Sequence, residues 1–183
     1  MNESLNSLFP NAKMIFFFSL MNLILKNKFI YLNDYKIKCA IGKRGITSKK
    51  SEGDKCTPRG KFKLKYVFYR KDRIKKFHSE LKLIAIKKNF GWCDDISSRY
   101  YNKFVTFPFE GKAEKLYLNK NCYDIIIVLD YNLNPIKRNK GSAIFLHVAS
   151  RNYSPTLGCV AISKSDIILL LSSINKNTFL KII

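Results

Sequence analysis

A cysteine and a histidine near the C-terminal end of the chain are the residues whose types and spacing could do chemistry. Residues 145–163 read FLHVASRNYSPTLGCVAIS, with His147 near the end of one apolar run and Cys159 at the start of the next. A free thiol titrates near about pH 8.5 and is mostly protonated at neutral pH, but an adjacent imidazole can take its proton. The resulting thiolate–imidazolium pair attacks carbonyl groups. The pair therefore predicts acyl transfer, with Cys159 as nucleophile and His147 as base.

The residue before the cysteine suggests how a reaction intermediate would be stabilised. Gly158 permits close approach of the backbone, and its position should leave amide N–H groups free to bind the oxyanion of a tetrahedral intermediate. Taken alone, the pair is a weak signal, because a lone histidine on an apolar strand is more often a core residue and a buried cysteine is usually inert. No orienting partner for His147 is identifiable, and we expect a backbone carbonyl to fill that role.

The remaining cysteines indicate neither a metal site nor a second nucleophile. None of the five cysteines stands in a C-x-x-C pair, and the chain has only two histidines, His78 and His147. A structural zinc site needs ligands clustered at short spacing, so no metal site is predicted, and we expect no cofactor. Four cysteines are assigned to packing: Cys39, Cys56, Cys93 and Cys122.

Short strands separated by turns must position the pair. Residues 28–32 and 35–41 flank Asn33-Asp34 and predict a hairpin. A polar, glycine-rich loop follows over residues 42–60, and residues 91–102 (GWCDDISSRYYN) predict an ordered loop. Alternating or β-branched apolar runs predict further strands at 62–69, 82–87, 123–129, 143–148, 159–162 and 179–183.

One helix is predicted, late in the chain. Residues 167–174 are apolar, Ser165 can cap the helix, and Asp166 suits its positive N-terminal end. Many strands with one late α-helix indicate a mainly β domain, which we expect to be a sandwich or partial barrel.

The length of 183 residues suits one domain. We place that domain at residues 28–183 and treat residues 1–27 as an N-terminal extension or a degenerate signal segment. The run at 14–25 (MIFFFSLMNLIL) has about the length of the apolar region of a signal peptide and is too short to span a bilayer. Because Glu3 is acidic and no cleavage site follows, an export signal and a buried extension both stay open.

The charge of the chain is strongly basic. It has 34 Lys+Arg against 13 Asp+Glu, a formal net charge of +21, which attracts nucleic acid, an anionic membrane surface or an acidic glycopolymer. The lysines are scattered, however, and abundant Lys, Asn, Ile and Phe together are what an AT-rich coding bias produces. We therefore interpret most of the excess as solvated surface. A basic nucleic-acid-binding domain is the rival to an enzyme, but no nucleic-acid motif is present and we expect no nucleic-acid partner.

Several motifs, which follow one another along the chain, strengthen the prediction that His147 and Cys159 are catalytic. The stretch GSAIFLH…PTLGCVAI places His147, Thr156, Gly158 and Cys159 in the pattern H…[S/T]-x-G-C, and TPRGKF within residues 52–62 fits T-P-x-G-x-[FY]. Together with GWCDDISSRYYN and YDIIIVLDYN, they resemble the L,D-transpeptidase catalytic domain, the YkuD-like family, from about residue 28 to the C-terminus. The resemblance implies a YkuD-like β-sandwich or partial barrel with His147 and Cys159 as catalytic residues.

The chain departs from the family pattern at three points. Leu157 replaces the histidine of the S-H-G-C sequence found in better-studied members, which is not the usual base. Ala161 stands where Arg or Asn is frequent, so a contact to a substrate carboxylate would come from elsewhere, for which we name Arg151. The loop between His147 and Cys159 is also shorter than in many members, which suggests an open cleft.

The resemblance implies a peptidoglycan L,D-transpeptidase in the cell envelope or periplasm, concerned with cell-wall biogenesis and cell shape. Its partners would be stem peptides. The thiolate would attack at the L-centre of the diamino acid at stem position three, and an amine from a second stem would resolve the thioester into a 3→3 cross-link. With water as acceptor the same pair would make an L,D-carboxypeptidase, and with a lipoprotein lysine an anchoring enzyme. The sequence does not fix the oligomeric state.

Other residues near these motifs keep two interpretations. Trp92 is either a wall of the substrate cleft or ordinary core. Asp94 and Asp95 either bind the ammonium group of the acceptor or, as we favour, cap their loop.

Overall fold

The structure is a computed structural model that describes residues 22–183. Residues 14–21 of the predicted signal segment lie outside this range. The end of the same apolar run forms strand β1 (Leu23–Lys26), in which Leu23 and Leu25 are fully buried. Because β1 pairs with two other strands of the main sheet, the folded domain begins before the predicted boundary at residue 28.

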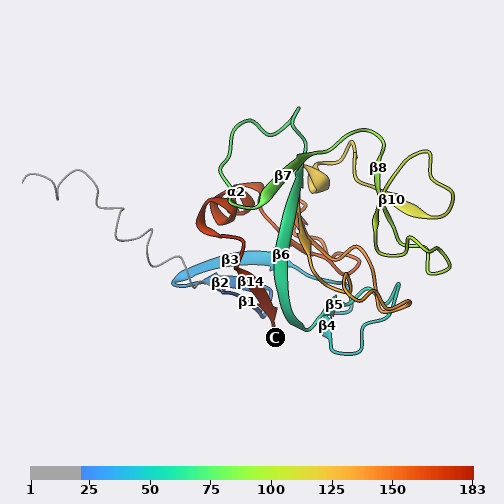
Figure 1. Cartoon of the computed structure of the whole chain (residues 1–183). Coiled ribbons are helices and arrows are strands. Elements are labelled where there is room, and N and C mark those ends of the chain that lie inside the picture. The colour runs from blue at the N-terminus through green and yellow to red at the C-terminus, as the bar shows by residue number, and fades with distance from the viewer. Residues whose placement is uncertain (1–21) are drawn as a thin grey trace, which may run out of the picture.

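The main sheet has nine strands among the described residues and curls into a partial barrel (Figure 1). Its order is β11-β12-β13-β3-β2-β1-β14-β6-β7, and β11 also pairs with β6, which brings the two sides together. Besides β1, the strands are β2 (Phe29–Leu32), β3 (Tyr35–Ala40), β6 (Gly60–Tyr69), β7 (Lys82–Ala85), β11 (Ile125–Leu129), β12 (Phe145–Val148), β13 (Val160–Ile162) and β14 (Phe179–Ile182). The predicted hairpin is present, with Leu32 opposite Tyr35.

A second, small sheet lies beside the barrel. It consists of β8 (Phe90–Cys93), β9 (Phe104–Thr106) and β10 (Ala113–Lys115), in the order β10-β8-β9. The start of the predicted loop at residues 91–102 is thus part of a strand. Two further strands, β4 (Ile46–Thr47) and β5 (Thr57–Pro58), pair within the glycine-rich loop, and a short 3₁₀ helix, η2 (Asn121–Tyr123), precedes β11.

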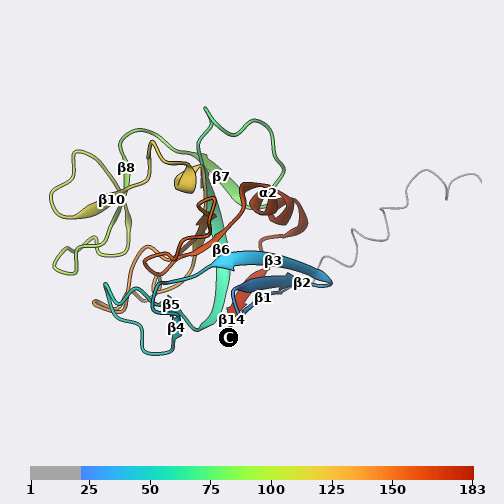
Figure 2. The same cartoon turned by 180° about the vertical axis from the view of Figure 1, so that it is seen from behind.

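Two buried clusters lie on opposite faces of β11, β12 and β13. Side chains alternate between the faces of a strand, so Leu146 and Val148 point into the barrel while Phe145 points outward. The inner cluster also contains residues of helix α2 (Lys164–Ser173), and the outer cluster contains Trp92 of the small sheet. Figures 1 and 2 show α2 and the small sheet on opposite sides of β6. Burial on both faces explains the uninterrupted apolar sequence of β11.

The helix is present, but its cap is not the predicted one. The N-cap is Ser163, whose Oγ accepts a hydrogen bond from the Asp166 N–H at 3.0 Å, whereas Ser165 lies in the first turn. Both serines carry a hydroxyl at the start of the apolar run, so composition alone could not separate them. In the described part of the chain, no helix has the length and apolar character that a membrane span requires.

Replacing the cap should destabilise the domain without touching the site. We expect Ser163→Ala to lower the free energy of unfolding by about 1 kcal/mol, because the Asp166 N–H loses its acceptor. Ser165→Ala, the matched control, should change it by less than about 0.5 kcal/mol. Urea unfolding of both variants measures the difference, and a larger cost for Ser165→Ala would show that the cap is misassigned.

Candidate active site

The predicted nucleophile and base lie on one face of the sheet. Strands β12 and β13 are parallel neighbours, with Leu146 opposite Val160 and His147 opposite Ala161. One step back along both strands, Cys159 lies beside Phe145, whose backbone N–H donates to the thiol sulfur at 3.4 Å. Since alternate residues share a face, His147 and Cys159 both point outward, toward the small sheet.

The thiol is enclosed in the resting protein. Cys159 is 9% exposed, and its Sγ donates to the Ala143 carbonyl oxygen at 3.1 Å. Within residues 22–183, no hydrogen bond joins this sulfur to His147, although the two side chains lie on the same face of the sheet. Hydrogen bonds of catalytic groups often tighten only once substrate is bound, so this geometry is compatible with a nucleophile–base pair.

Backbone carbonyls hold the imidazole, as the sequence led us to expect. The Nδ1 of His147 lies 3.0 Å from the Val148 carbonyl oxygen, and the Cys122 carbonyl is a second backbone acceptor for the ring. The ring of Tyr123 meets the imidazole edge to face, with 5.3 Å between the centroids. These contacts come from β12 itself and from η2, so the turn before β11 orients the base.

The pair is uncharged at rest. Burial raises the pKa of Cys159 to about 12, the negative charge of Glu114 adds to the rise, and the Phe145 N–H and the charge of Lys50 oppose it. Burial likewise lowers the pKa of His147, against the effect of its two carbonyl acceptors. Both shifts favour the neutral forms. We therefore expect proton transfer from Cys159 to His147 to accompany attack on the substrate.

Alkylation of the resting protein reports this protonation state. We expect iodoacetamide to modify Cys159 slowly at neutral pH, with a rate that rises about tenfold per pH unit across roughly pH 7 to 10, because the thiolate fraction grows at that rate below the raised pKa. Peptide mass mapping follows the site, and the urea-unfolded protein serves as the reference. A rate that is already level at neutral pH would show a preformed thiolate.

Two threonines fix the backbone before the nucleophile. The hydroxyl of Thr57, which is fully buried, donates to the Gly158 carbonyl oxygen at 2.9 Å and accepts from the Gly42 N–H at 2.8 Å. Thr156 donates to the Cys159 carbonyl oxygen at 2.6 Å and accepts from the Gly158 N–H at 3.1 Å. The T-P element of the sequence therefore acts by holding the strand that carries the thiol.

The backbone conformation and the space at position 158 both require glycine. Its φ is +145°, and a Cβ there would lie 3.0 Å from the Cys56 carbonyl oxygen, so a larger residue would be strained. Its N–H is hydrogen-bonded to Thr156 rather than free as expected, because a threonine two residues earlier competes for that amide. Its role at an oxyanion stays a prediction.

The other predicted binding residues lie apart from the thiol or beneath the surface. Arg151 is exposed in the loop between β12 and β13. Trp92 is 2% exposed, its Nε1 donates to the Asn102 Oδ1 at 2.9 Å, and its ring meets Phe145 edge to face. Its placement fits the core interpretation and puts it directly under the strand of the base. A contact of either residue with substrate stays a prediction.

Two residues whose charges affect the pKa of Cys159 were not identified from the sequence. Glu114 comes from β10 of the small sheet and accepts a hydrogen bond from the Tyr123 hydroxyl at 2.7 Å. Lys50 is buried, and its Nζ lies 2.5 Å from Asp54 Oδ1. No motif marks either residue, since both reach the site from loops and strands far away in sequence.

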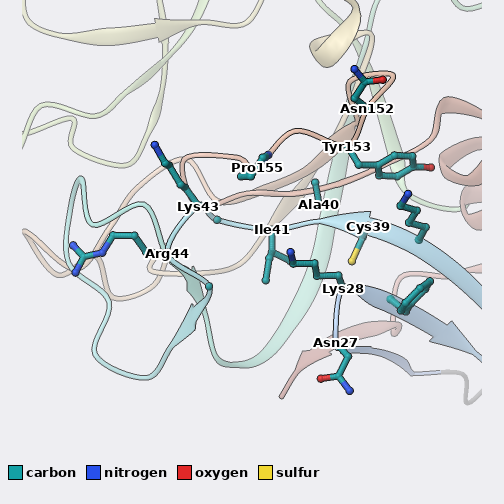
Figure 3. Close-up of a pocket in the computed structure, with 14 residues that line it drawn as sticks. Asn27, Lys28, Cys39, Ala40, Ile41, Lys43, Arg44, Asn152, Tyr153 and Pro155 are labelled. Carbon is teal, nitrogen blue, oxygen red and sulfur yellow. The ribbon is translucent and has the colours of Figure 1, made fainter.

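A well-formed cavity lies elsewhere on the domain. A cavity of about 640 Å³ lies between β3 and the loop before Cys159, and neither Cys159 nor His147 lines it (Figure 3). Four of its fourteen lining residues are Lys or Arg, compared with 34 of 183 in the chain, which is too small an enrichment to mark an anion site. Figure 3 shows the Arg44 side chain extending away from Lys28, so these charges do not converge.

The described residues offer no assignable metal ligand set. Between residues 22 and 183, no three His, Cys, Asp or Glu side chains gather as a metal site requires. The chemistry that the arrangement itself supports is nucleophilic attack by a thiol with an imidazole as base.

Comparison with known proteins gives one family. The family model described as YkuD, the L,D-transpeptidase catalytic domain, matches residues 20–182. No curated protein sequence matches the chain. Among solved structures, the chain is similar to the crystal structure of Mycobacterium tuberculosis L,D-transpeptidase 1, with a TM-score of 0.42 and 8% sequence identity over 89% of this chain and 58% of that chain. The chain thus spans a little over half the length of that protein.

Proposed function

The chain belongs to the L,D-transpeptidase catalytic-domain family (YkuD), and on that premise we propose that it is a peptidoglycan L,D-transpeptidase with Cys159 as its nucleophile. The observation that carries the proposal is the parallel pairing of β12 and β13. It sets His147 and Cys159, at the two motif positions, on the same face of one sheet. The substrates would be stem peptides of peptidoglycan.

In the proposed first half-reaction, the thiol leaves the Ala143 carbonyl and attacks the carbonyl at the L-centre of the diamino acid in stem position three. His147 takes the thiol proton as the sulfur–carbon bond forms, and passes it to the nitrogen of the terminal D-residue as that amide bond breaks. The products are a thioester on Cys159 and a free D-amino acid. The second half-reaction reverses these roles: an amine attacks the thioester, His147 receives its proton, and the departing sulfur takes that proton back.

The contacts of His147 support its role as a transient base. A neutral imidazole has one N–H, but an imidazolium has two and can donate to two acceptors. The carbonyls of Val148 and Cys122 are two such acceptors, and both act to raise the pKa of the ring. They favour the protonated form that exists only while the reaction proceeds, which is the kind of interaction that accelerates a chemical step.

Incubation with a disaccharide tetrapeptide, followed by mass spectrometry of the products, tests this function. A transpeptidase releases the terminal D-residue and forms 3→3 cross-linked dimers. Release with tripeptide alone as the product would instead indicate an L,D-carboxypeptidase with the same pair. The rival of a nucleic-acid-binding domain predicts no product, and affinity for nucleic acid that falls steeply with salt and survives loss of Cys159.

The proposed substrate also implies where the protein works. Stem peptides lie outside the cytoplasmic membrane, so we propose that the protein acts in the cell envelope or periplasm. Cell fractionation tests this placement, and recovery of the protein wholly from the cytoplasm would contradict it.

A further inference from the structure

Glu114 lies on the small sheet next to the candidate site, hydrogen-bonded to Tyr123, and the chemistry described so far makes no use of it. The residue stands in the middle of β10, where it pairs with Trp92 of β8. This small sheet covers the outward face of β12 and β13, the face that carries Cys159 and His147. Glu114 is only partly exposed, and its carboxylate is close enough to the thiol for its charge to raise the pKa of Cys159, second in effect to burial.

A hydrogen bond ties this carboxylate to the catalytic pair. The Tyr123 hydroxyl donates to Glu114 Oε1 at 2.7 Å, and the same tyrosine ring meets the His147 ring at 5.3 Å and the Phe145 ring at 6.3 Å between centroids. Tyr123 therefore spans the space between Glu114 and the base. The carboxylate is thus linked, through one side chain, to the ring of the candidate base.

The carboxylate lacks a cation. In the described chain, no Lys or Arg nitrogen forms an ion pair with Glu114, although the protein has 34 Lys+Arg and only 13 Asp+Glu. The positive charge of Lys112 acts to lower the pKa of Glu114, but the Nζ of this lysine already forms an ion pair with Asp94 Oδ2 at 3.1 Å. Burial raises the pKa of Glu114. A partly buried carboxylate is costly unless it is paired, so an arriving cation would be stabilised here.

A second observation points to the same missing cation. The other oxygen of Asp94, Oδ1, is buried and has no hydrogen-bond partner among the described residues. Glu114 pairs with Trp92, two residues before Asp94, and the negative charge of Asp94 also acts on Glu114. Buried polar atoms without partners are rare, and here the unsatisfied atom is an acceptor that suits a donor with several protons. A primary ammonium group has three.

We propose that Glu114 binds the ammonium group of the acceptor and takes its proton, so that the site selects an amine over water to resolve the thioester. The inference rests on the proposed function and assigns its acceptor as a primary amine. The steps balance: the ammonium gives one proton to the Glu114 carboxylate, and the neutral amine attacks the thioester carbon. The amine then loses its second proton to His147, the carbon–sulfur bond breaks, and the sulfur recovers that proton. The Glu114 proton afterwards returns to water.

The ratio of cross-linked product to hydrolysed product measures this selection. We expect Glu114→Gln to lower that ratio about tenfold or more, the loss that fits one charge-assisted hydrogen bond, while thioester formation on Cys159 persists. The amide still offers an oxygen to the Tyr123 hydroxyl. Glu110→Gln is the matched control, because it removes the same charge from an exposed position in the preceding loop and should leave the ratio unchanged.

Hydroxylamine, which is uncharged at neutral pH, is a second acceptor that separates binding of the cation from general damage. Glu114→Gln should lower the rate of thioester resolution by the charged amine far more than the rate of resolution by hydroxylamine. In the wild-type protein, resolution should saturate with a diamino-acid peptide as acceptor but not with hydroxylamine, and this measurement does not depend on any variant folding. An unchanged product ratio in Glu114→Gln, or no saturation by the charged amine, would overturn this inference alone. Absence of any acyl-enzyme in the wild-type protein would overturn the proposed function as well.

Discussion

Cys159→Ala is expected to abolish formation of the acyl-enzyme and of every product, while the domain stays folded. The sulfur is the only atom in the proposed mechanism that bonds to the substrate, so no residual route remains. The structural cost is small, because one sulfur atom is lost from the outer cluster, and we expect about 1 kcal/mol in the free energy of unfolding. Product analysis by mass spectrometry and thermal melting measure the two effects separately.

Two variants sharpen this result. Cys159→Ser keeps a hydroxyl that can donate to the Ala143 carbonyl, as the thiol does, but it should be nearly inactive because a hydroxyl ionises far less readily than a thiol. Cys122→Ala removes a half-buried thiol next to the same cluster and should retain activity. Full activity in Cys159→Ala would refute the mechanism, and so would a loss of activity that only follows a loss of fold.

His147→Ala and His147→Gln should each lower the rate of acylation by about a hundredfold or more, the range typical for loss of a general base. The pH profile should also change. With the pKa of Cys159 raised to about 12, the thiol stays protonated at neutral pH unless a base removes its proton. In these variants the rate should therefore climb about tenfold per pH unit up to alkaline pH, because only the ionised fraction reacts.

His78 provides the control for this prediction. It is the only other histidine of the chain, it lies outside both buried clusters, and His78→Ala should leave the rate and the pH profile unchanged. Stopped-flow measurement of acylation across the pH range gives both quantities. An unchanged rate in His147→Ala would remove this residue from the mechanism.

Apart from β1, which was assigned to the N-terminal extension, the strands of the main sheet were predictable because each carries its own pattern. Residues 125–129 are apolar, four of the five are β-branched, and the structure buries all five in β11. The small sheet was missed because β8 contains a glycine and leads into Asp94 and Asp95, which are turn-forming residues, and because β10 has only three residues. Its strands are held by packing on the outer cluster, which no local pattern reveals.

The candidate site also has features that the sequence could predict and features that it could not. The placement of His147 and Cys159 on neighbouring strands was predictable, because two apolar runs and one short loop carry them. The position of Glu114 was not predictable, since it comes from a separate sheet and is linked to the base through Tyr123. The resting charge state was not predictable for a related reason: motif spacing places a thiol near an imidazole but does not show how deeply either is buried.

The most direct test of the central claim is to trap the thioester and locate it. A carbapenem has a strained β-lactam carbonyl that the Cys159 thiol should open, giving a stable adduct. Intact-protein mass spectrometry followed by peptide mapping should show one added molecule per chain, on Cys159 and on none of the other four cysteines, and no adduct in Cys159→Ala. An adduct on another cysteine, or on Cys159→Ala at the wild-type level, would contradict the assignment of Cys159 as the nucleophile.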